Sequence, residues 1–299
     1  MKKNLLQGTF TALITPFLPS GEVDFDAFTN IIEDQIKNKV EGIVVAGSTG
    51  ENFALSFKEK TALLVKSVET AQGRIKVIAG TGTNETKASC DNTILAKELG
   101  ADAALVVTPY YNKPTQDGLF EHYKLIADTS DGFPIIVYNI PGRSSVNINA
   151  ETMLRIAEAC PNVIAAKEAS ADLEQMMEII RNAPEHFSLL SGDDYLTLPV
   201  VLMGGKGVIS AISNYAPLQF SEMTRLALAD KFSKALKIHY ELFDLMNLNF
   251  AEPNPAPIKY IMSKLGFCQE IYRMPMMPIK KSNKNLIDAA LQAAGFIGK

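Results

Sequence analysis

Short apolar runs alternate with longer amphipathic stretches along most of the chain. The apolar runs are expected to form strands at residues 8–16, 42–46, 75–79, 103–107, 134–138, 163–167, 188–191 and 207–209. The stretches that follow them repeat apolar residues at helical spacing and predict helices near residues 24–39, 56–71, 84–99, 115–128, 149–160, 171–182, 194–203 and 217–229. Asp24 and Asn84 are expected to cap the first and the third of these helices.

Apolar strands that are each followed by a helix are typical of a parallel sheet with both faces buried. Eight such units in about 230 residues favour a closed α/β architecture, the (β/α)8 TIM barrel, over an open doubly wound sheet. The open sheet stays an alternative, because a strand count does not show closure. The lack of a GxGxxG motif after the first strand argues against the dinucleotide-binding form of that alternative.

The alternation ends near residue 231. Three amphipathic helices are expected after it, near residues 231–247, 255–265 and 284–294, with a proline-broken loop at 273–279. Because apolar spacing of this kind needs a surface to pack on, the tail is interpreted as a C-terminal helical extension rather than a linker. We therefore expect residues 1–230 to form the barrel and residues 231–299 to form the extension.

Composition and charge narrow the class of protein. Hydrophobic residues make up 47% of the 299 residues and charged residues 21%, as in a globular protein, and the net charge of −4 comes without a clustered basic face. Neither nucleic acid nor a membrane is therefore expected as a partner. Cys90, Cys160 and Cys268 form no CxxC pair, which favours free thiols in a reducing compartment. With no long apolar run near the N-terminus, a cytoplasmic protein is expected.

The candidate chemistry lies at the predicted strand ends. In barrels of this kind the working residues lie at the C-terminal ends of the strands and in the loops that follow. Those positions hold an unusual concentration of hydroxyl groups together with one lysine and one arginine, namely Ser48, Thr49, Tyr111, Tyr138, Arg143 and Lys167.

Lys167 ends an apolar run, and by strand alternation it shares a face with Val163 and Ala165. A lysine that projects into an apolar barrel mouth loses hydration, which lowers its pKa and frees the amine to attack a carbonyl group. The alternative is a lysine that pairs with Glu168 or reaches solvent, and a lone lysine at a strand end would favour it. The hydroxyl groups predicted near Lys167 favour its interpretation as a nucleophile over this alternative.

Tyr138 ends the strand that precedes Lys167, and its phenol could pass protons to and from an intermediate on the lysine. Tyr111 could extend that relay. The planar fork of Arg143 suits a carboxylate. Each of these side chains also has an ordinary interpretation, as a hydrogen-bonded rim tyrosine or a surface ion pair. The histidines have no metal-ligand spacing, so neither a metal nor another cofactor is expected.

Several segments, in this order, resemble the dihydrodipicolinate synthase / N-acetylneuraminate lyase superfamily. They are GSTGE (47–51), TPYYNKPTQDG (108–118), YNIPGR (138–143), KEAS (167–170), SGDD (191–194), GVIS (207–210), EPNPAPIKY (252–260) and RMPMMPI (273–279), so the resemblance covers essentially the whole chain. It implies a Schiff-base aldolase barrel with a helical C-terminal extension, commonly a homotetramer built as a dimer of tight dimers.

The resemblance also implies roles for single residues. It carries the Schiff base onto Lys167 and the proton relay onto Tyr138, and Tyr111 matches a tyrosine that completes the relay of the neighbouring subunit. Ser48 and Thr49 match the pair that contacts the substrate carboxylate and the relay. Two further substrate-binding positions come from the SGDD and GVIS segments, Gly192 and Ile209.

Within the superfamily, the TPYYN and PGR segments resemble the synthases, in which the arginine matched by Arg143 holds the carboxylate of aspartate semialdehyde. Lyases that act on sialic acid usually lack that arginine, although the Ser48-Thr49 form is commoner among them. The preferred hypothesis is the condensation of pyruvate with L-aspartate 4-semialdehyde to 4-hydroxy-tetrahydrodipicolinate in lysine biosynthesis. The alternatives are a sibling class I aldolase such as N-acetylneuraminate lyase, and a non-catalytic barrel that binds 2-oxo acids.

The resemblance finally suggests weak regulation by lysine. Family members that lysine inhibits bind it at the dimer interface through acidic and imidazole groups. Lys60 at a matching position would repel the ammonium group of lysine, and Ala88 cannot pair with it. We therefore expect weak or absent inhibition, although other matching positions hold Glu51, Phe57, Asn84 and Tyr110.

Overall fold

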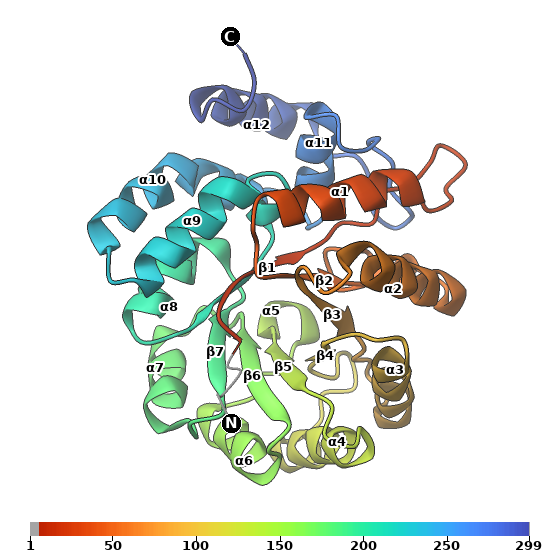
Figure 1. Ribbon diagram of the computed structural model, residues 1–299, viewed down its shortest axis with the longest axis vertical. Coiled ribbons are helices and arrows are strands. Elements are labelled where there is room, and N and C mark those ends of the chain that lie inside the picture. Colours follow the sequence, from red (N-terminus) through yellow and green to blue (C-terminus); the bar gives the residue numbers. More distant parts are fainter. Residues whose placement is uncertain (1–5, 299) are drawn as a thin grey trace.

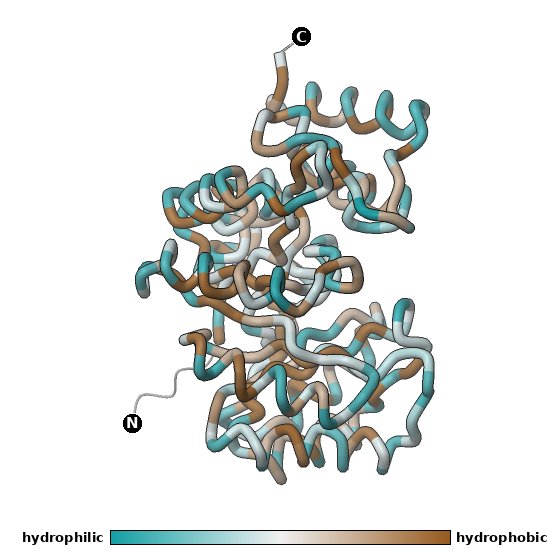
Figure 2. The backbone as a smooth tube through the Cα atoms, turned by 90° about the vertical axis from the view of Figure 1, so that its right-hand side faces the viewer, coloured by the Kyte–Doolittle hydropathy of each residue, from teal (hydrophilic) through white to brown (hydrophobic). Residues whose placement is uncertain are grey.

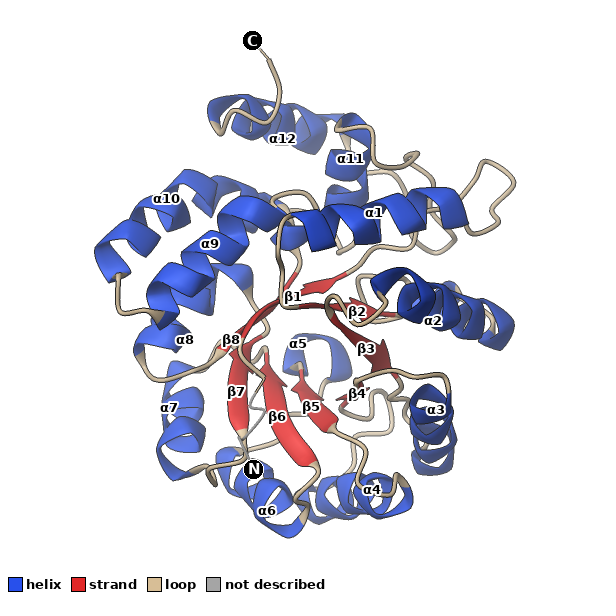
Figure 3. Cartoon of the chain, in the orientation of Figure 1, coloured by secondary structure: helices blue, strands red, loops and turns tan. Residues whose placement is uncertain are grey.

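The parallel sheet closes into a barrel (Figure 1 and Figure 3). The computed structural model describes residues 6–298. The strands follow one another around the barrel in sequence order, and β1 pairs with β8 to close it. They are β1 (Gly8–Ala12), β2 (Gly42–Val45), β3 (Lys76–Gly80), β4 (Ala103–Val107), β5 (Ile135–Asn139), β6 (Val163–Glu168), β7 (Ser188–Ser191) and β8 (Gly207–Ser210). The predicted barrel is confirmed, and the open sheet is excluded.

Helices surround the barrel and complete each crossover (Figure 3). They are α1 (Phe25–Lys37), α2 (Phe57–Ala71), α3 (Thr86–Glu98), α4 (Gln116–Thr129), α6 (Ala150–Ala159), α7 (Leu173–Asn182), α8 (Thr197–Leu202) and α9 (Pro217–Leu228). Short helical turns lie in the loops at the C-terminal strand ends, at η1 (Asn52–Ala54), α5 (Pro141–Ser144), η2 (Asp194–Leu196) and η3 (Ile212–Asn214). The tube in Figure 2 shows hydrophilic and hydrophobic residues alternating along the helices, as amphipathic packing requires.

Side-chain caps set the starts of these helices. Asp24 caps α1 as predicted, since its side chain accepts a hydrogen bond from the backbone N–H of Ala27. The prediction that Asn84 caps α3 is wrong. The cap is Glu85, whose carboxylate accepts hydrogen bonds from the backbone N–H groups of Lys87 and Ala88, at 2.8 and 2.5 Å. Asn84 lies one position too early, and its carbonyl accepts a hydrogen bond from a loop side chain instead.

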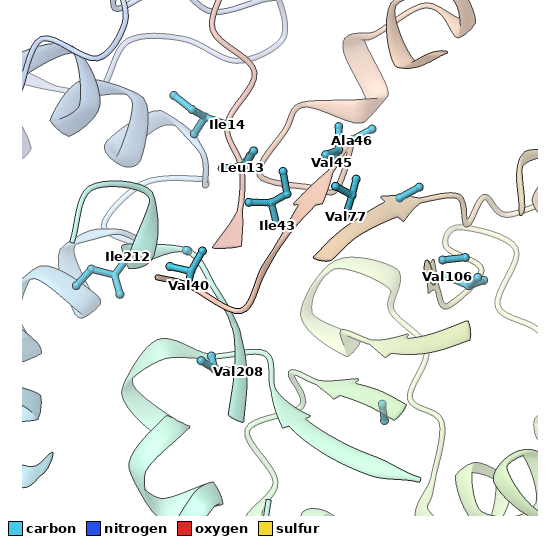
Figure 4. Packing of buried hydrophobic residues seen from close by; sticks show 14 of the residues in the cluster. Leu13, Ile14, Val40, Ile43, Val45, Ala46, Val77, Val106, Val208 and Ile212 are labelled. Atoms are coloured by element: carbon cyan, nitrogen blue, oxygen red, sulfur yellow. The ribbon is translucent and has the colours of Figure 1, made fainter. Parts of the chain in front are cut away.

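Two apolar cores result from strand alternation. Inward residues such as Phe10, Val44 and Ile136 fill the barrel, whereas outward residues such as Ile43 and Val77 pack against the helices. Figure 4 shows part of this outer core, where side chains of neighbouring strands lie close together. The barrel interior is therefore a packed core, and any cavity for a ligand has to lie at the strand ends.

A bulge in β6 decides which side chains of this strand face inward. Ile135 pairs with Val163 and Ile136 with Ala165, so Ile164 is an extra residue. Val163 therefore belongs to the outer core and Ala165 to the inner core. The prediction that Val163 shares a face with Ala165 and Lys167 is wrong for this reason.

The C-terminal extension consists of α10 (Phe232–Leu248), α11 (Ala256–Lys264) and α12 (Lys281–Ala293). α10 packs along α9 and α12, and Figure 1 shows α11 and α12 at one end of the molecule. The division at residues 230 and 231 stays a prediction. Residues 1–5, which belong to the N-terminal segment on which the expectation of a cytoplasmic protein rests, lie outside the described residues. Within residues 6–298, no helix has the length and hydrophobicity needed to cross a membrane.

Closure of the barrel gives a first prediction. Gly207 pairs with Gly8 and has a φ of +139°, and an added Cβ would overlap the Gly8 carbonyl oxygen. We expect Gly207→Ala to lower the free energy of unfolding by about 3–5 kcal/mol, because overpacking adds to backbone strain. Gly73→Ala is the matched control, since Gly73 has a φ of +72° but open space around it, and it should cost about 1–2 kcal/mol. Urea unfolding measures both variants. Equal losses of unfolding free energy in the two would contradict the role of the close contact between Gly207 and Gly8.

Candidate active site

A cavity opens at the C-terminal ends of the strands. Most of the residues that the sequence singled out line it together, namely Ser48, Thr49, Tyr138, Arg143, Lys167, Gly192 and Ile209. The barrel rule therefore located the cavity correctly.

Lys167 lies deep in this cavity and is only 7% exposed. Its Nζ atom lies 4.2 Å from the centre of the Tyr138 ring. Burial lowers the pKa of Lys167 to about 8, opposed by the nearby Asp193 and Asp194 and assisted by the positive charge of Arg143. A substantial fraction of the amine is therefore neutral near physiological pH, which is the form that attacks a carbonyl.

The alternative in which Lys167 pairs with Glu168 is wrong. Adjacent strand residues point to opposite faces, so Glu168 faces away from the cavity. Its buried carboxylate accepts hydrogen bonds from Asn139 Nδ2 at 3.0 Å, from Ser170 N at 2.9 Å and from Gln175 Nε2 at 3.3 Å. Glu168 thus ties β5 to β6 and α7 and leaves Lys167 free to react.

Tyr138 pairs with Lys167 across β5 and β6, which brings phenol and amine together. Its main-chain carbonyl accepts hydrogen bonds from the backbone N–H and from the hydroxyl of Thr108, both at 2.9 Å. Burial raises the pKa of the Tyr138 phenol, and Arg143 and a hydrogen bond with Ser48 act in the opposite direction. The phenol is therefore protonated at rest and has a hydroxyl partner with which to exchange a proton.

Thr49 and Arg143 are both held by Asn254, which lies in the C-terminal extension. Asn254 Nδ2 donates a hydrogen bond to Thr49 Oγ1 at 2.9 Å, and the main-chain carbonyl of Asn254 accepts one from an Arg143 Nη atom at 3.2 Å. The exposed guanidinium of Arg143 thereby stays at the cavity mouth, where it can meet an entering anion.

Two acidic residues follow β7 and have different surroundings. Asp193 lines the cavity. Asp194 is buried beneath it and accepts hydrogen bonds from the backbone N–H groups of Ala211 and Ile212, at 3.1 and 2.8 Å. Burial raises the pKa of Asp194 to about 6. Asp194 therefore has a structural role in fixing the loop after β8. Within residues 6–298, no three His, Cys, Asp or Glu side chains gather as a metal site requires.

Tyr111 is the predicted site residue that does not line the cavity of its own chain. Its side chain is 88% exposed and its φ is +77°, a backbone conformation that bulky residues rarely adopt. The strand-end rule placed it on the rim but could not predict which way the loop turns.

Phe250, Asn254 and Asp193 also line the cavity and were not among the predicted site residues. Phe250 and Asn254 belong to the extension, which the strand-end rule does not cover. The signal that could have identified Asn254 is its place in the EPNPAPIKY segment, which contributed to the resemblance without a role being assigned.

The chain is similar to known proteins over nearly its whole length. A model of the dihydrodipicolinate synthetase family matches residues 5–294. The 4-hydroxy-tetrahydrodipicolinate synthase of Aquifex aeolicus is 46% identical over 288 residues, which cover 96% of this chain and 97% of that protein. The crystal structure of dihydrodipicolinate synthase from that organism has a TM-score of 0.94 and covers the same shares of the two chains. A structure of the Cyanidioschyzon merolae synthase with lysine bound has a TM-score of 0.94 at 37% identity and covers 97% of this chain and 99% of that one.

The burial of Lys167 gives a prediction on pH. Its amine should become reactive with a midpoint near pH 8, because only the neutral form is a nucleophile. Competitive acetylation across pH, read peptide by peptide in a mass spectrometer, measures this. Lys87 is the control, since its hydrogen bond with Asp91 raises its pKa and should delay its labelling to higher pH. A Lys167 that titrates together with Lys87 would contradict the desolvation argument.

Proposed function

The chain belongs to the dihydrodipicolinate synthetase family, and we propose that it condenses pyruvate with L-aspartate 4-semialdehyde to 4-hydroxy-tetrahydrodipicolinate in lysine biosynthesis. It is a lyase of that family. The observation that carries the proposal is a buried amine of lowered pKa, Lys167, beside a phenol and below an arginine.

Lys167 begins the reaction. Its neutral amine adds to the C2 carbonyl of pyruvate, and loss of water leaves an imine between pyruvate and the lysine. This covalent Schiff base activates the substrate without a cofactor. Removal of a C3 proton gives an enamine, whose C3 forms a bond to the aldehyde carbon of the second substrate. The amino group of that substrate then displaces Lys167 at C2, which closes the ring and returns the free enzyme.

These steps need protons to be moved at the carbinolamine and at the new hydroxyl group. Tyr138 lies beside Lys167 and can donate and accept these protons, and Ser48 is its hydrogen-bonded partner. Thr49 contributes a second hydroxyl to the carboxylate of pyruvate, while Gly192 and Ile209 form the walls around it. We assign Tyr111 to the relay of a neighbouring subunit, because its side chain is 88% exposed and does not line the cavity of its own chain.

Arg143 selects the second substrate. Its guanidinium at the cavity mouth can bind the carboxylate of aspartate semialdehyde in a bidentate manner. This assignment disfavours a sialic acid lyase despite the Ser48-Thr49 form of the first motif.

We propose a homotetramer, a dimer of dimers, in the cytoplasm. Four aromatic side chains on the loops and helices after β2 and β4 are exposed and would be covered by a partner, namely Phe53, Phe57, Tyr110 and Tyr111. In this assembly the site is complete only when the partner supplies Tyr111.

A coupled assay tests the function. Purified chain is given pyruvate and aspartate semialdehyde with a reductase that consumes the product and oxidises NADPH. Lys167→Ala should abolish turnover. Arg143→Ala should raise the KM for the semialdehyde about 10- to 100-fold through loss of a charged hydrogen bond, while borohydride still traps pyruvate on Lys167. Arg155→Ala, which removes a surface ion pair with Asp117 and a cation–π contact with the Phe120 ring, is the matched control.

Other outcomes identify other functions. No turnover by a folded wild-type chain would overturn the synthase. Borohydride trapping of pyruvate would then indicate a sibling aldolase, and its failure a barrel without chemistry. Normal turnover by Arg143→Ala would remove Arg143 from substrate recognition.

Weak inhibition by lysine is a separate prediction. Phe57 and Lys60 line a second cavity between α2 and α3, and Lys60 is half-buried there. Glu51, which the resemblance placed among the lysine-binding positions, is fully buried and bonded to Lys259, so that expectation is corrected. We expect millimolar lysine to leave turnover nearly unchanged. The variant Lys60→Gln/Ala88→Glu should gain sensitivity, and strong inhibition of the wild type by sub-millimolar lysine would contradict the prediction.

A further inference from the structure

The C-terminal extension holds the turn that carries two of the site hydroxyls. This turn, residues 47–51, contains Ser48 and Thr49 and is here called the hydroxyl turn. One contact joins the extension to Thr49 in the middle of the turn, and a second joins it to Glu51 at the end. The partners lie 205 and 208 residues further along the chain.

The second contact is an ion pair without access to solvent. Lys259 on α11 donates a hydrogen bond to Glu51 Oε1 at 2.7 Å, and both side chains are 0% exposed. The other carboxylate oxygen accepts a long hydrogen bond of 3.4 Å from the backbone N–H of Arg273. The Lys259 Nζ atom also lies 4.1 Å from the centre of the Phe17 ring. The Glu51 carboxylate is thus fixed by two groups of the extension.

Glu51 transmits this constraint to the backbone of the hydroxyl turn. Its φ is +54°, and its N–H donates to the carbonyl of Ser48 at 3.2 Å. Thr15 adds a hydrogen bond to the Gly50 carbonyl at 2.7 Å. A glutamate in the left-handed region needs surrounding contacts to stay there, so the position of its carboxylate and the shape of the turn are coupled.

Asn254 fixes the middle of the turn. Its Nδ2 atom holds the Thr49 hydroxyl at 2.9 Å, and the two residues are 6% and 5% exposed. The bond orients Thr49 Oγ1 within the cavity that also contains Lys167.

Stability alone does not account for the Glu51–Lys259 pair. Burying two charges removes their hydration, and an apolar pair of similar volume is often as stable or more so. What a buried pair supplies that an apolar pair lacks is one defined arrangement of two groups. Here that arrangement places the backbone next to Ser48 and Thr49.

We propose that Lys259 and Asn254 are positioning residues that set the hydroxyl turn for reaction, so that the C-terminal extension is a functional part of the active site. The inference rests on the proposed function, because the turn is taken to serve the pyruvate carboxylate and the proton relay. A displacement of about 1 Å in such a group lowers rates by up to about a hundredfold.

Lys259→Met tests the ion pair. It keeps the length of the side chain and leaves Glu51 without its charged partner. We expect kcat to fall about 10- to 100-fold and the KM for pyruvate to rise, both per active site that borohydride traps with pyruvate. Lys264→Met is the matched control, because Lys264 lies on the same helix and pairs with Asp288 of α12, at 2.8 Å, rather than with the hydroxyl turn. It should leave both constants unchanged.

A purely structural role predicts a different result. Lys259→Met would then lose folded protein, while each trapped site kept its kcat and KM, and this outcome would overturn the inference. No turnover by a wild-type chain that still traps pyruvate would overturn the second substrate of the proposed function instead. The KM for pyruvate, read from trapping alone, would still test Lys259 in that case.

If Lys259→Met fails to fold, a double-mutant cycle of Asn254 and Thr49 tests whether the extension positions the hydroxyl turn. Asn254→Ala and Thr49→Val each remove one partner of the hydrogen bond and keep the main-chain acceptor of Arg143. If Asn254 acts through Thr49, the double variant should lose no more kcat/KM than the worse single variant. Losses that multiply would show that Asn254 does not act through Thr49 and would overturn the inference.

Discussion

Exclusion of water at the end of β6 is the constraint on which the chemistry of this chain depends. The closed sheet surrounds Lys167 with inward apolar side chains such as Ala165 and Ile209, and the pKa of the lysine falls to about 8. Each pKa unit corresponds to about 1.4 kcal/mol, so the charged amine destabilises the fold at neutral pH by about 3 kcal/mol. The unfolded chain holds one more proton between pH 8 and 10.5, so stability rises with pH in that window and is lowest below it. The loss of hydration that destabilises the fold is therefore the same effect that makes the Lys167 amine reactive.

The two faces of β6 have different functions, and the bulge at Ile164 decides which side chains lie on each face. Lys167 faces the cavity, while Glu168 faces the helices and is satisfied there by Asn139 and Gln175. Because strand side chains alternate with a period of two, a shift by one residue would exchange the two groups. The cavity would then hold a carboxylate, and an unpaired lysine would lie in the outer core. The hydrogen bonds of Glu168 oppose such a shift and so preserve the reactive face.

Hydrophobic spacing was sufficient to predict the eight strands, because a barrel strand between two apolar layers leaves a strong periodic signal. The rule that strand ends carry the chemistry then brought Ser48, Tyr138 and Lys167 together in one cavity. Asn254 escaped both arguments, since its contact with Thr49 joins residues 205 positions apart and has no local pattern. Local geometry was missed for a related reason. The bulge in β6 and the cap of α3 depend on pairing and loop contacts that periodicity does not encode.

Lys167 and Lys259 are both lysines, but their surroundings give them different functions. Both side chains are buried, and burial alone would favour the neutral amine in each. Lys259 has a carboxylate at 2.7 Å and an aromatic ring beneath it, which favour its charged form, and removal of one partner of such a pair costs about 3–5 kcal/mol. Among the described residues, no carboxylate forms a hydrogen bond or ion pair with Lys167. The charges of Asp193 and Asp194 act on it without such a contact, and Glu168 points away. The paired lysine therefore serves as an anchor between the extension and the barrel, and the unpaired lysine can lose its proton and react.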